Sequence, residues 1–326
     1  MKLKKEQAAK LLEALSGHGK VLVPVEEDGV SKFVPYDVSV KFNMERVNTV
    51  LPPKDALFPQ TQKMYRFKTG KNAEIEEIID ADEQIIFGIR PCDVQSVVCL
   101  DEVFLTKTFV DNFYARKREK LTMIAVGCTN PMPTCFCESM GLAMDSAPAA
   151  DVLFVPTGDG WNVKCQSEKG KALIEKIGIF EDGEGEPLKP AGNELKVNMD
   201  GVAEKLEGMF EHPMWDEVYQ PCLGCGTCTF ICPTCFCFEM TPETRRSEGT
   251  KNRHWDSCMY PEYTRMAGGH NPRPTEKERL RNRYMHKLSF FARRYGMGLC
   301  VGCGRCVEKC PVGLDITEII DRVGEA

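Results

Sequence analysis

Two runs of four cysteines in the last third of the chain have a spacing that is typical of iron–sulfur proteins. They read CLGCGTCTFICP and CVGCGRCVEKCP, so both follow the pattern C-x2-C-x2-C-x3-C-P. In this pattern thiolates bind the irons of two [4Fe–4S] cubes, and the fourth cysteine of each run binds the other cube. The first predicted cluster therefore has the ligands Cys222, Cys225, Cys228 and Cys310. The second has Cys300, Cys303, Cys306 and Cys232.

Zinc is the main alternative for these eight cysteines. Structural zinc sites commonly use two C-x2-C pairs, which supply four ligands to one ion. Two matching runs of four cysteines, each closed by a proline, fit that arrangement poorly. We therefore expect two [4Fe–4S] clusters in this part of the chain.

The word PTCFC occurs twice, and its first copy predicts a third cluster. This copy carries Cys135 and Cys137, while Cys92 and Cys128 each follow an apolar run that reads as a β-strand. Because the ends of neighbouring parallel strands face one crevice, these four thiols can converge. Four cysteines are the ligand number of a [4Fe–4S] cube. Reduced, half-buried thiols packed in a core are the alternative.

The second copy of PTCFC leaves thiols that the two cysteine runs do not use. These are Cys235, Cys237 and Cys258. They can act as reactive thiols, pack around the clusters, or form a further metal site with one of three side chains: His254, Asp256 or His270. The letters CPTC also match a thiol–disulfide motif, but its first cysteine, Cys232, already has a place in a cluster.

The segment between the two runs predicts a helix over residues 275–296. Thr275 and Glu278 form a capping box, an apolar stripe follows at helical spacing, and Gly296 is a typical end. The last third therefore reads as two cluster loops joined by helices. We expect an α-helical ferredoxin-like domain over residues 216–326.

Positive charge is concentrated in this segment. Residues 245–294 hold 13 Lys and Arg against 5 Asp and Glu, although the whole chain has a net charge of −6. A basic block can bind nucleic acid, but no recognition motif accompanies it. A cube with four thiolates is negative, and cations offset the cost of burying it. Arg279, Arg283 and His286 share one helix face and are candidates for this role, although a solvated charged face has the same pattern.

Residues 1–215 read as a mixed α/β domain. Strands are expected at 20–27, 84–90, 121–128 and 151–158, with a hairpin at 154–165. Helices are expected at 8–15, 93–104 and 200–211, where Asp93 would cap its helix. Residues 181–196 are polar and rich in Gly and Pro, which indicates a loop or linker.

The composition favours a reducing compartment. The N-terminus is charged and lacks an apolar signal region, and no apolar run is long enough for a membrane span. In a cytoplasmic chain, the 17 cysteines indicate metal or redox chemistry rather than disulfides. Cys99 lies in an apolar helix and Cys165 at a hairpin end, so we expect structural roles for both.

Six stretches of the chain resemble a known family. They are LFPQTQKMYRF, FGIRPCDVQSVVCLDEVFL, VGCTNPMPTCFCESMG, CLGCGTCTFICPTCFCFEM, HWDSCMYPEYTRMAGGHNPRPTEKERLRNRYMHK and CVGCGRCVEKCPVGLDI. The family comprises the 4Fe–4S dicluster subunits of soluble anaerobic redox complexes. Its members include the β subunit of archaeal sulfhydrogenase, a cytosolic NiFe hydrogenase, and the A subunit of anaerobic sulfite reductase. The equivalent subunit of flavin oxidoreductase–heterodisulfide reductase complexes is similar.

The resemblance implies a non-catalytic subunit that relays electrons. Its partners would be a flavin-binding, NAD(P)H-linked subunit and a terminal catalytic subunit of the hydrogenase, sulfite reductase or heterodisulfide reductase type. The sequence agrees, because it has no nucleotide fingerprint, P-loop or haem motif of its own. A catalytic protein that reduces disulfides or sulfur compounds at the spare cysteines is an alternative, and a redox sensor is another. The absence of a flavin site, which would supply electrons, counts against the catalytic protein. The many cluster ligands count against the sensor, because a sensor needs only one labile cluster.

Overall fold

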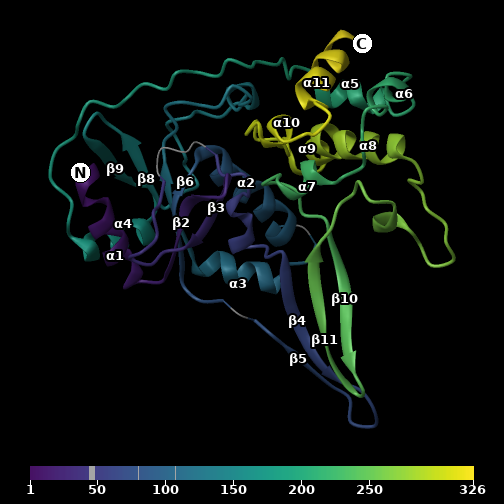
Figure 1. Cartoon of the computed structure of the whole chain (residues 1–326), viewed down its shortest axis with the longest axis horizontal. Coiled ribbons are helices and arrows are strands. Elements are labelled where there is room, and N and C mark those ends of the chain that lie inside the picture. Colours follow the sequence, from purple (N-terminus) through teal and green to yellow (C-terminus); the bar gives the residue numbers. More distant parts are fainter. Residues whose placement is uncertain (44–47, 80, 107) are drawn as a thin grey trace.

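A seven-stranded sheet forms the centre of the N-terminal part (Figure 1). The computed structural model describes residues 1–43, 48–79, 81–106 and 108–326. The strand order is β1-β9-β8-β7-β6-β2-β3, and β2, β6, β7 and β8 run parallel. The bounds are β1 (Lys2–Lys4), β2 (Lys20–Glu27), β3 (Val30–Pro35), β6 (Gln84–Ile89), β7 (Leu121–Val126), β8 (Val152–Pro156) and β9 (Gly160–Cys165). The predicted mixed α/β fold, its four strands and its hairpin are confirmed.

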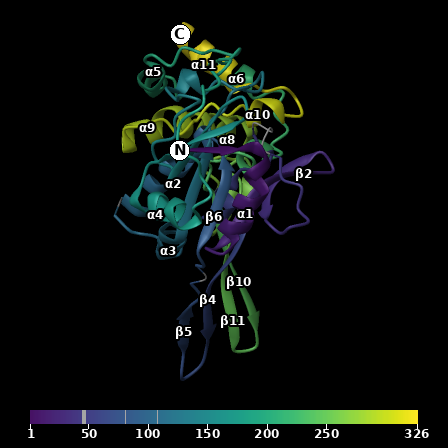
Figure 2. The same cartoon turned by 90° about the vertical axis from the view of Figure 1, so that its left-hand side faces the viewer.

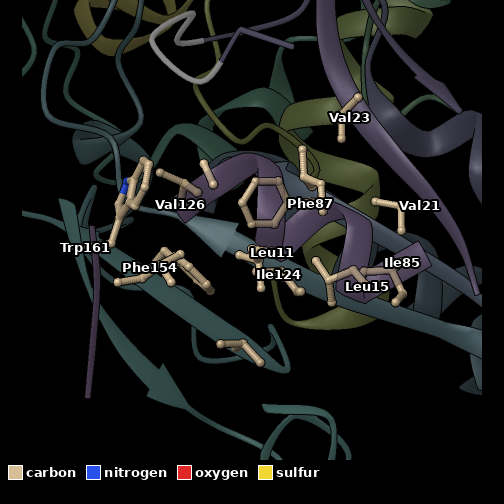
Figure 3. Packing of buried hydrophobic residues seen from close by; sticks show 14 of the residues in the cluster. Leu11, Leu15, Val21, Val23, Ile85, Phe87, Ile124, Val126, Phe154 and Trp161 are labelled. Atoms are coloured by element: carbon tan, nitrogen blue, oxygen red, sulfur yellow. The ribbon is translucent and has the colours of Figure 1, made fainter. Parts of the chain in front are cut away.

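Helices cover both faces of this sheet. They are α1 (Ala8–Ser16) and α4 (Glu168–Ile177) on one face, and α2 (Pro91–Asp101) and α3 (Asn112–Lys120) on the other. Successive strand residues point to opposite faces, so Ile85 and Phe87 pack with Leu11 of α1, whereas Ile86 packs on the α2 side. Figure 3 shows the first of these cores, in which Ile124 and neighbouring apolar side chains fill the space under α1.

A second sheet projects from the body as an arm (Figures 1 and 2). Its order is β10-β11-β4-β5, and the bounds are β4 (Thr61–Lys68), β5 (Glu74–Glu77), β10 (Phe238–Arg245) and β11 (Glu248–Trp255). Strand β11 pairs with β4, so His254 lies opposite Thr61. The prediction that helices alone join the two cysteine runs is therefore wrong for residues 238–255. Strands from both sides of the predicted boundary at residue 215 share one sheet.

Short helices surround the cysteine runs. They are α5 (Val202–Gly208), α6 (Trp215–Val218), α7 (Thr227–Phe230), α8 (Glu276–Met285), α9 (Phe291–Tyr295), α10 (Arg305–Glu308) and α11 (Ile316–Glu325). Two π-helical turns, Glu102–Thr106 and His286–Phe290, follow α2 and α8. Four 3-10 turns complete the helices: Lys5–Gln7, Pro53–Ala56, Glu138–Met140 and Pro261–Thr264. The predicted capping box of Thr275 and Glu278 is present, and Gly296 ends α9 in the left-handed region, as predicted.

A separate apolar core joins these helices. Val202 and Leu206 of α5 pack with Leu280 of α8 and Ile320 of α11. The side chain of Trp215 stacks near Tyr284, with ring centroids 6.5 Å apart. In the part of the chain that the structure describes, no helix has both the length and the apolar surface needed to cross a bilayer.

Candidate metal centres

The eight cysteines of the two runs line two cavities. The first cavity is lined by one set: Cys222, Cys225, Cys228 and Cys310. The second cavity is lined by the other set: Cys232, Cys300, Cys303 and Cys306. The structure thus brings together both sets as grouped from the sequence, with the last cysteine of each run at the cavity of the other run.

Glycines and backbone N–H groups shape the loops of the first cavity. Gly226 has φ of +76°, and a Cβ there would lie 2.8 Å from the hydroxyl oxygen of Tyr260. The N–H of Gly224 donates to Cys222 Sγ over 3.5 Å, and the N–H of Leu314 donates to Cys310 Sγ over 3.2 Å. Amide donors aimed at sulfur stabilise a negative cluster. This donor set therefore fits a thiolate-bound cube.

A third cavity lies at the carboxyl ends of the parallel strands. Together with Cys303, the four predicted cysteines line it: Cys92, Cys128, Cys135 and Cys137. Cys92 is in the first turn of α2, directly after β6, and Cys128 lies two residues beyond β7. Because β6 and β7 are parallel neighbours, their ends bring these two thiols to one place. The loop that follows β7 returns with the other two. All four predicted thiols are therefore gathered around one space.

Asn48 links the third cavity to the second cysteine run, although no sequence motif singles this residue out. Its side-chain amide donates to the carbonyl of Cys303 over 2.7 Å and to Cys135 Sγ over 3.6 Å. The Cys92 thiol donates to its Oδ1 over 3.6 Å. One buried amide thus contacts residues from three separate segments.

The first PTCFC loop also lies directly against the second cysteine run. The N–H of Phe136 donates to the carbonyl of Gly302 over 2.8 Å. A Cβ on Gly302 would lie 2.6 Å from Cys137 Cα, and one on Gly304 would lie 2.5 Å from the Thr134 carbonyl oxygen. Both glycines have positive φ, +60° and +73°. Only glycine allows this contact between the two loops.

The three cavities lie in a row, because each cavity shares a lining cysteine with the next. Cys303 lines both the third and the second cavity. Cys306 lines both the second and the first. The second cavity is therefore in the middle.

Buried cations accompany the thiols. Lys287 Nζ donates to Cys232 Sγ over 3.3 Å and to Thr234 Oγ1 over 2.9 Å. Burial acts to lower the pKa of Lys287, but the negative charge of nearby cysteines outweighs it and raises this pKa. Arg283 lines the first cavity, and its pKa is raised in the same way by Cys228. In the absence of iron, burial raises the pKa of the Cys300 thiol to about 11.

The three predicted cationic partners differ in position. Arg283 lines the first cavity. Arg279 is buried but bonds to Glu276 and to the carbonyl of Pro274. The ring of His286 packs edge-on against Phe236, and burial lowers its pKa to about 4. Lys287, four residues after Arg283, lies at the thiols. The sequence pattern predicted His286 for this position.

Asp93 does not cap α2, which corrects the prediction. The helix begins after Arg90 and has no side-chain cap. Asp93 instead pairs with Arg305, a residue of the second cysteine run. The Arg90 guanidinium lines the third cavity and donates to the carbonyl of Gly127 over 3.0 Å. No sequence pattern singled out either arginine, although Arg305 stands between Cys303 and Cys306.

The spare cysteines form pairs rather than one group. Cys235 lies close to Cys232, and Cys237 close to Cys258, so that the members of each pair shift one another's pKa in opposite directions. Proximity to the Cys258 thiol and N–H and to the Tyr263 hydroxyl lowers the pKa of the Cys237 thiol to about 6. Lys54, which the sequence analysis also missed, is buried beside them and donates from Nζ to the carbonyl of Cys235 over 2.9 Å.

The further metal site suggested for these thiols does not assemble. His254 Nδ1 lies 3.1 Å from Thr61 Oγ1, and Asp256 accepts from the N–H of Ser257. His270 is exposed. Over the described ranges, no three His, Cys, Asp or Glu side chains have the geometry of a single-ion site. The ligands of a single zinc ion all lie within about 2.3 Å of it, whereas the thiolates of a cube bind different irons.

Cys99 and Cys165 lie apart from the three cavities. Cys99 is fully buried, and its thiol donates to the carbonyl of Gly298 over 3.7 Å. Cys165 ends β9 and is half-buried.

Comparisons with known proteins agree with this arrangement. Residues 221–314 match the model of a 4Fe-4S dicluster domain. The whole chain aligns with sulfhydrogenase 2 subunit beta of Pyrococcus furiosus, with 33% identity over 338 residues that cover 98% of that protein. The chain belongs to this family of iron–sulfur electron-transfer subunits. The predicted family and the predicted [4Fe–4S] cofactor class are thereby confirmed.

A second relative is more distant. The F420-dependent formate dehydrogenase subunit beta of Methanocaldococcus jannaschii is 24% identical over 177 residues, which are 50% of this chain and 39% of that protein. No solved structure matches the chain.

Proposed function

We propose that the chain holds three [4Fe–4S] clusters in a row and relays electrons within an oxidoreductase complex. The observation that carries this proposal is the row of three cavities, each lined by one complete set of four cysteines, in which Cys303 also lines the third cavity and Cys306 also lines the first. When bound, the clusters supply one-electron carriers. The residues of the chain hold them, keep water away and balance their charge.

Each cavity is lined by a cationic side chain that can balance the negative charge of a cluster. Arg283 lines the first cavity, Lys287 the second and Arg90 the third. A buried cation offsets the cost of placing a negative cluster in a medium of low dielectric constant. In the second cavity, which lies between the others, Lys287 donates directly to the sulfur of Cys232.

The direct contact between the loops supports a continuous route. Electron transfer weakens steeply with distance, so successive carriers must lie close together. The glycines of the second run let the first PTCFC loop approach to van der Waals contact, and Asn48 bridges Cys135 to the carbonyl of Cys303. We infer that the repeated word PTCFC in its first copy serves to complete the third ligand set.

For partners we propose the two classes that the family implies. One is a flavin-binding, NAD(P)H-linked subunit, and the other is a catalytic subunit of the hydrogenase, sulfite reductase or heterodisulfide reductase type. The names of the two relatives support an oxidoreductase complex, because one belongs to a sulfhydrogenase and the other to a formate dehydrogenase. A cytoplasmic location is part of the same proposal.

The test uses the complex purified without oxygen from native cells. Cys228→Ser should damage the first ligand set and Cys306→Ser the second. Both variants should block electron transfer from NAD(P)H to the terminal acceptor while dye reduction by the flavin subunit stays intact. Cys165→Ser, a half-buried thiol outside the cavities, is the matched control and should keep full transfer. Full transfer in the Cys306→Ser complex would contradict the proposed route.

A further inference from the structure

Two cysteines outside the three cavities flank the hairpin at the base of the arm. Cys237 directly precedes β10, and Cys258 follows β11 by three residues. The hairpin fixes both positions, because Phe238 pairs with Trp255 and the N–H of Asp256 donates to the carbonyl of Cys237 over 3.0 Å. The two thiols are therefore close enough to shift one another's pKa, that of Cys237 downward and that of Cys258 upward.

We propose that Cys237 and Cys258 form a thiol–disulfide exchange site, in which Cys237 attacks a low-molecular-weight disulfide and Cys258 resolves the product. This activity is separate from electron relay and requires no cluster. It gives a role to two of the thiols that the second PTCFC copy leaves outside the ligand sets.

The two cysteines differ in the way that these two roles require. Cys237 is half-buried and can meet a small molecule, whereas Cys258 is only 9% exposed. The thiol and the N–H of Cys258 and the Tyr263 hydroxyl are the neighbouring donors that lower the pKa of Cys237. Such donors stabilise a thiolate, which is the nucleophile in exchange reactions. An accessible thiolate next to a resolving cysteine is the arrangement of redox-reactive pairs.

The reaction balances in two steps. The Cys237 sulfur bonds to one sulfur of the small disulfide, and the other half leaves as a thiol carrying the proton that Cys237 gives up. The Cys258 sulfur then bonds to the Cys237 sulfur, and the second half leaves with the proton from Cys258. The two cysteines lose two electrons in total, and the small disulfide gains them to become two thiols.

The neighbouring pair, Cys232 and Cys235, is a weaker candidate for this chemistry. Cys232 lines the second cavity, where Lys287 donates to its sulfur. Its thiolate is thus committed to the proposed ligand set. Cys235 then has no partner thiol in this pair with which to form a disulfide.

The experiment treats the full-length chain, purified without oxygen, with 4,4′-dithiodipyridine, whose released thiopyridone absorbs light. We expect a fast phase that releases about two equivalents per chain, as attack and resolution require. After alkylation and digestion, mass spectrometry should find the peptides of Cys237 and Cys258 joined. Cys258→Ala should release about one equivalent and keep the probe on Cys237. Cys165→Ala, which removes an unpaired half-buried thiol, should leave the fast phase unchanged.

Two results would overturn the proposal. The first is obtained with the unaltered chain: mass spectrometry assigns the fast phase to other cysteines, or finds the peptides of Cys237 and Cys258 unlinked. The other is a loss of about four irons from Cys237→Ala, which would make this residue a cluster ligand. Iron and acid-labile sulfide measured on the same samples separate the two proposals, because a failure of the relay would leave the exchange phase intact.

Discussion

Arg305 and Asp93 form a bidentate ion pair that joins the two parts of the molecule. Arg305 Nη1 lies 2.6 Å from Asp93 Oδ1, and Nη2 lies 2.8 Å from Oδ2. The side chains are 2% and 1% exposed. Asp93 follows Cys92 of the third cavity, and Arg305 lies between Cys303 and Cys306 of the second. The pair therefore fixes the position of one ligand set relative to the next.

Replacing Asp93 with asparagine should destabilise the protein strongly. The change leaves a buried guanidinium without its counter-charge, and breaking a buried pair in this way costs about 3–5 kcal/mol. Anaerobic denaturant unfolding measures the free energy. The control is Glu76→Gln, which removes the exposed partner of Arg66 and should change the free energy of unfolding by less than about 1 kcal/mol. Equal effects of the two variants would show that the buried pair has no special role.

Replacing Lys287 with methionine should make the middle cluster harder to reduce. Methionine keeps much of the length of the side chain but removes the cation that donates to Cys232 Sγ. We expect a shift to more negative potential of about 60 mV or more, the equivalent of about 1.4 kcal/mol in a one-electron couple. An EPR-monitored redox titration measures it. Lys277→Met, which removes an exposed partner of Asp216, should leave every potential unchanged, and an equal shift there would refute the local explanation.

Alanine at Gly302 should separate the two loops that meet there. Its Cβ would overlap with Cys137, and the positive φ alone costs about 1–2 kcal/mol for a residue with a side chain. We expect a lower melting temperature and a loss of iron from the third set. Gly298 stands in the same segment with no atom within 4 Å of a Cβ. Gly298→Ala should therefore retain all iron, and a Gly302→Ala protein that did so as well would show that the loops need not touch.

Much of the site could be predicted because cluster ligation restricts the spacing of cysteines. The two runs and the cross-assignment of Cys232 and Cys310 were readable from one pattern. The third set required a further argument, that parallel strand ends converge, and the placement of Cys92 and Cys128 after β6 and β7 follows that argument.

The remaining features depend on contacts between distant parts of the chain. The hairpin of β10 and β11 pairs with β4, about 190 residues earlier, and both of its strands are largely polar, so local periodicity gave no signal. Asn48 and Lys54 lie in the N-terminal half, and their roles arise from contacts with Cys303 and Cys235. No local pattern distinguishes such residues from other polar residues.

The number of irons per chain tests the central claim most directly. Three cubes require about twelve irons and an equal amount of acid-labile sulfide in anaerobically prepared full-length protein. We expect the double variant Cys135→Ser with Cys137→Ser to contain about eight of each and to keep the EPR signals of the two clusters of the cysteine runs. Cys165→Ser should contain about twelve. If the unaltered chain contains only about eight irons, or if the double variant loses none, the third cavity holds no cluster and the row of three is wrong.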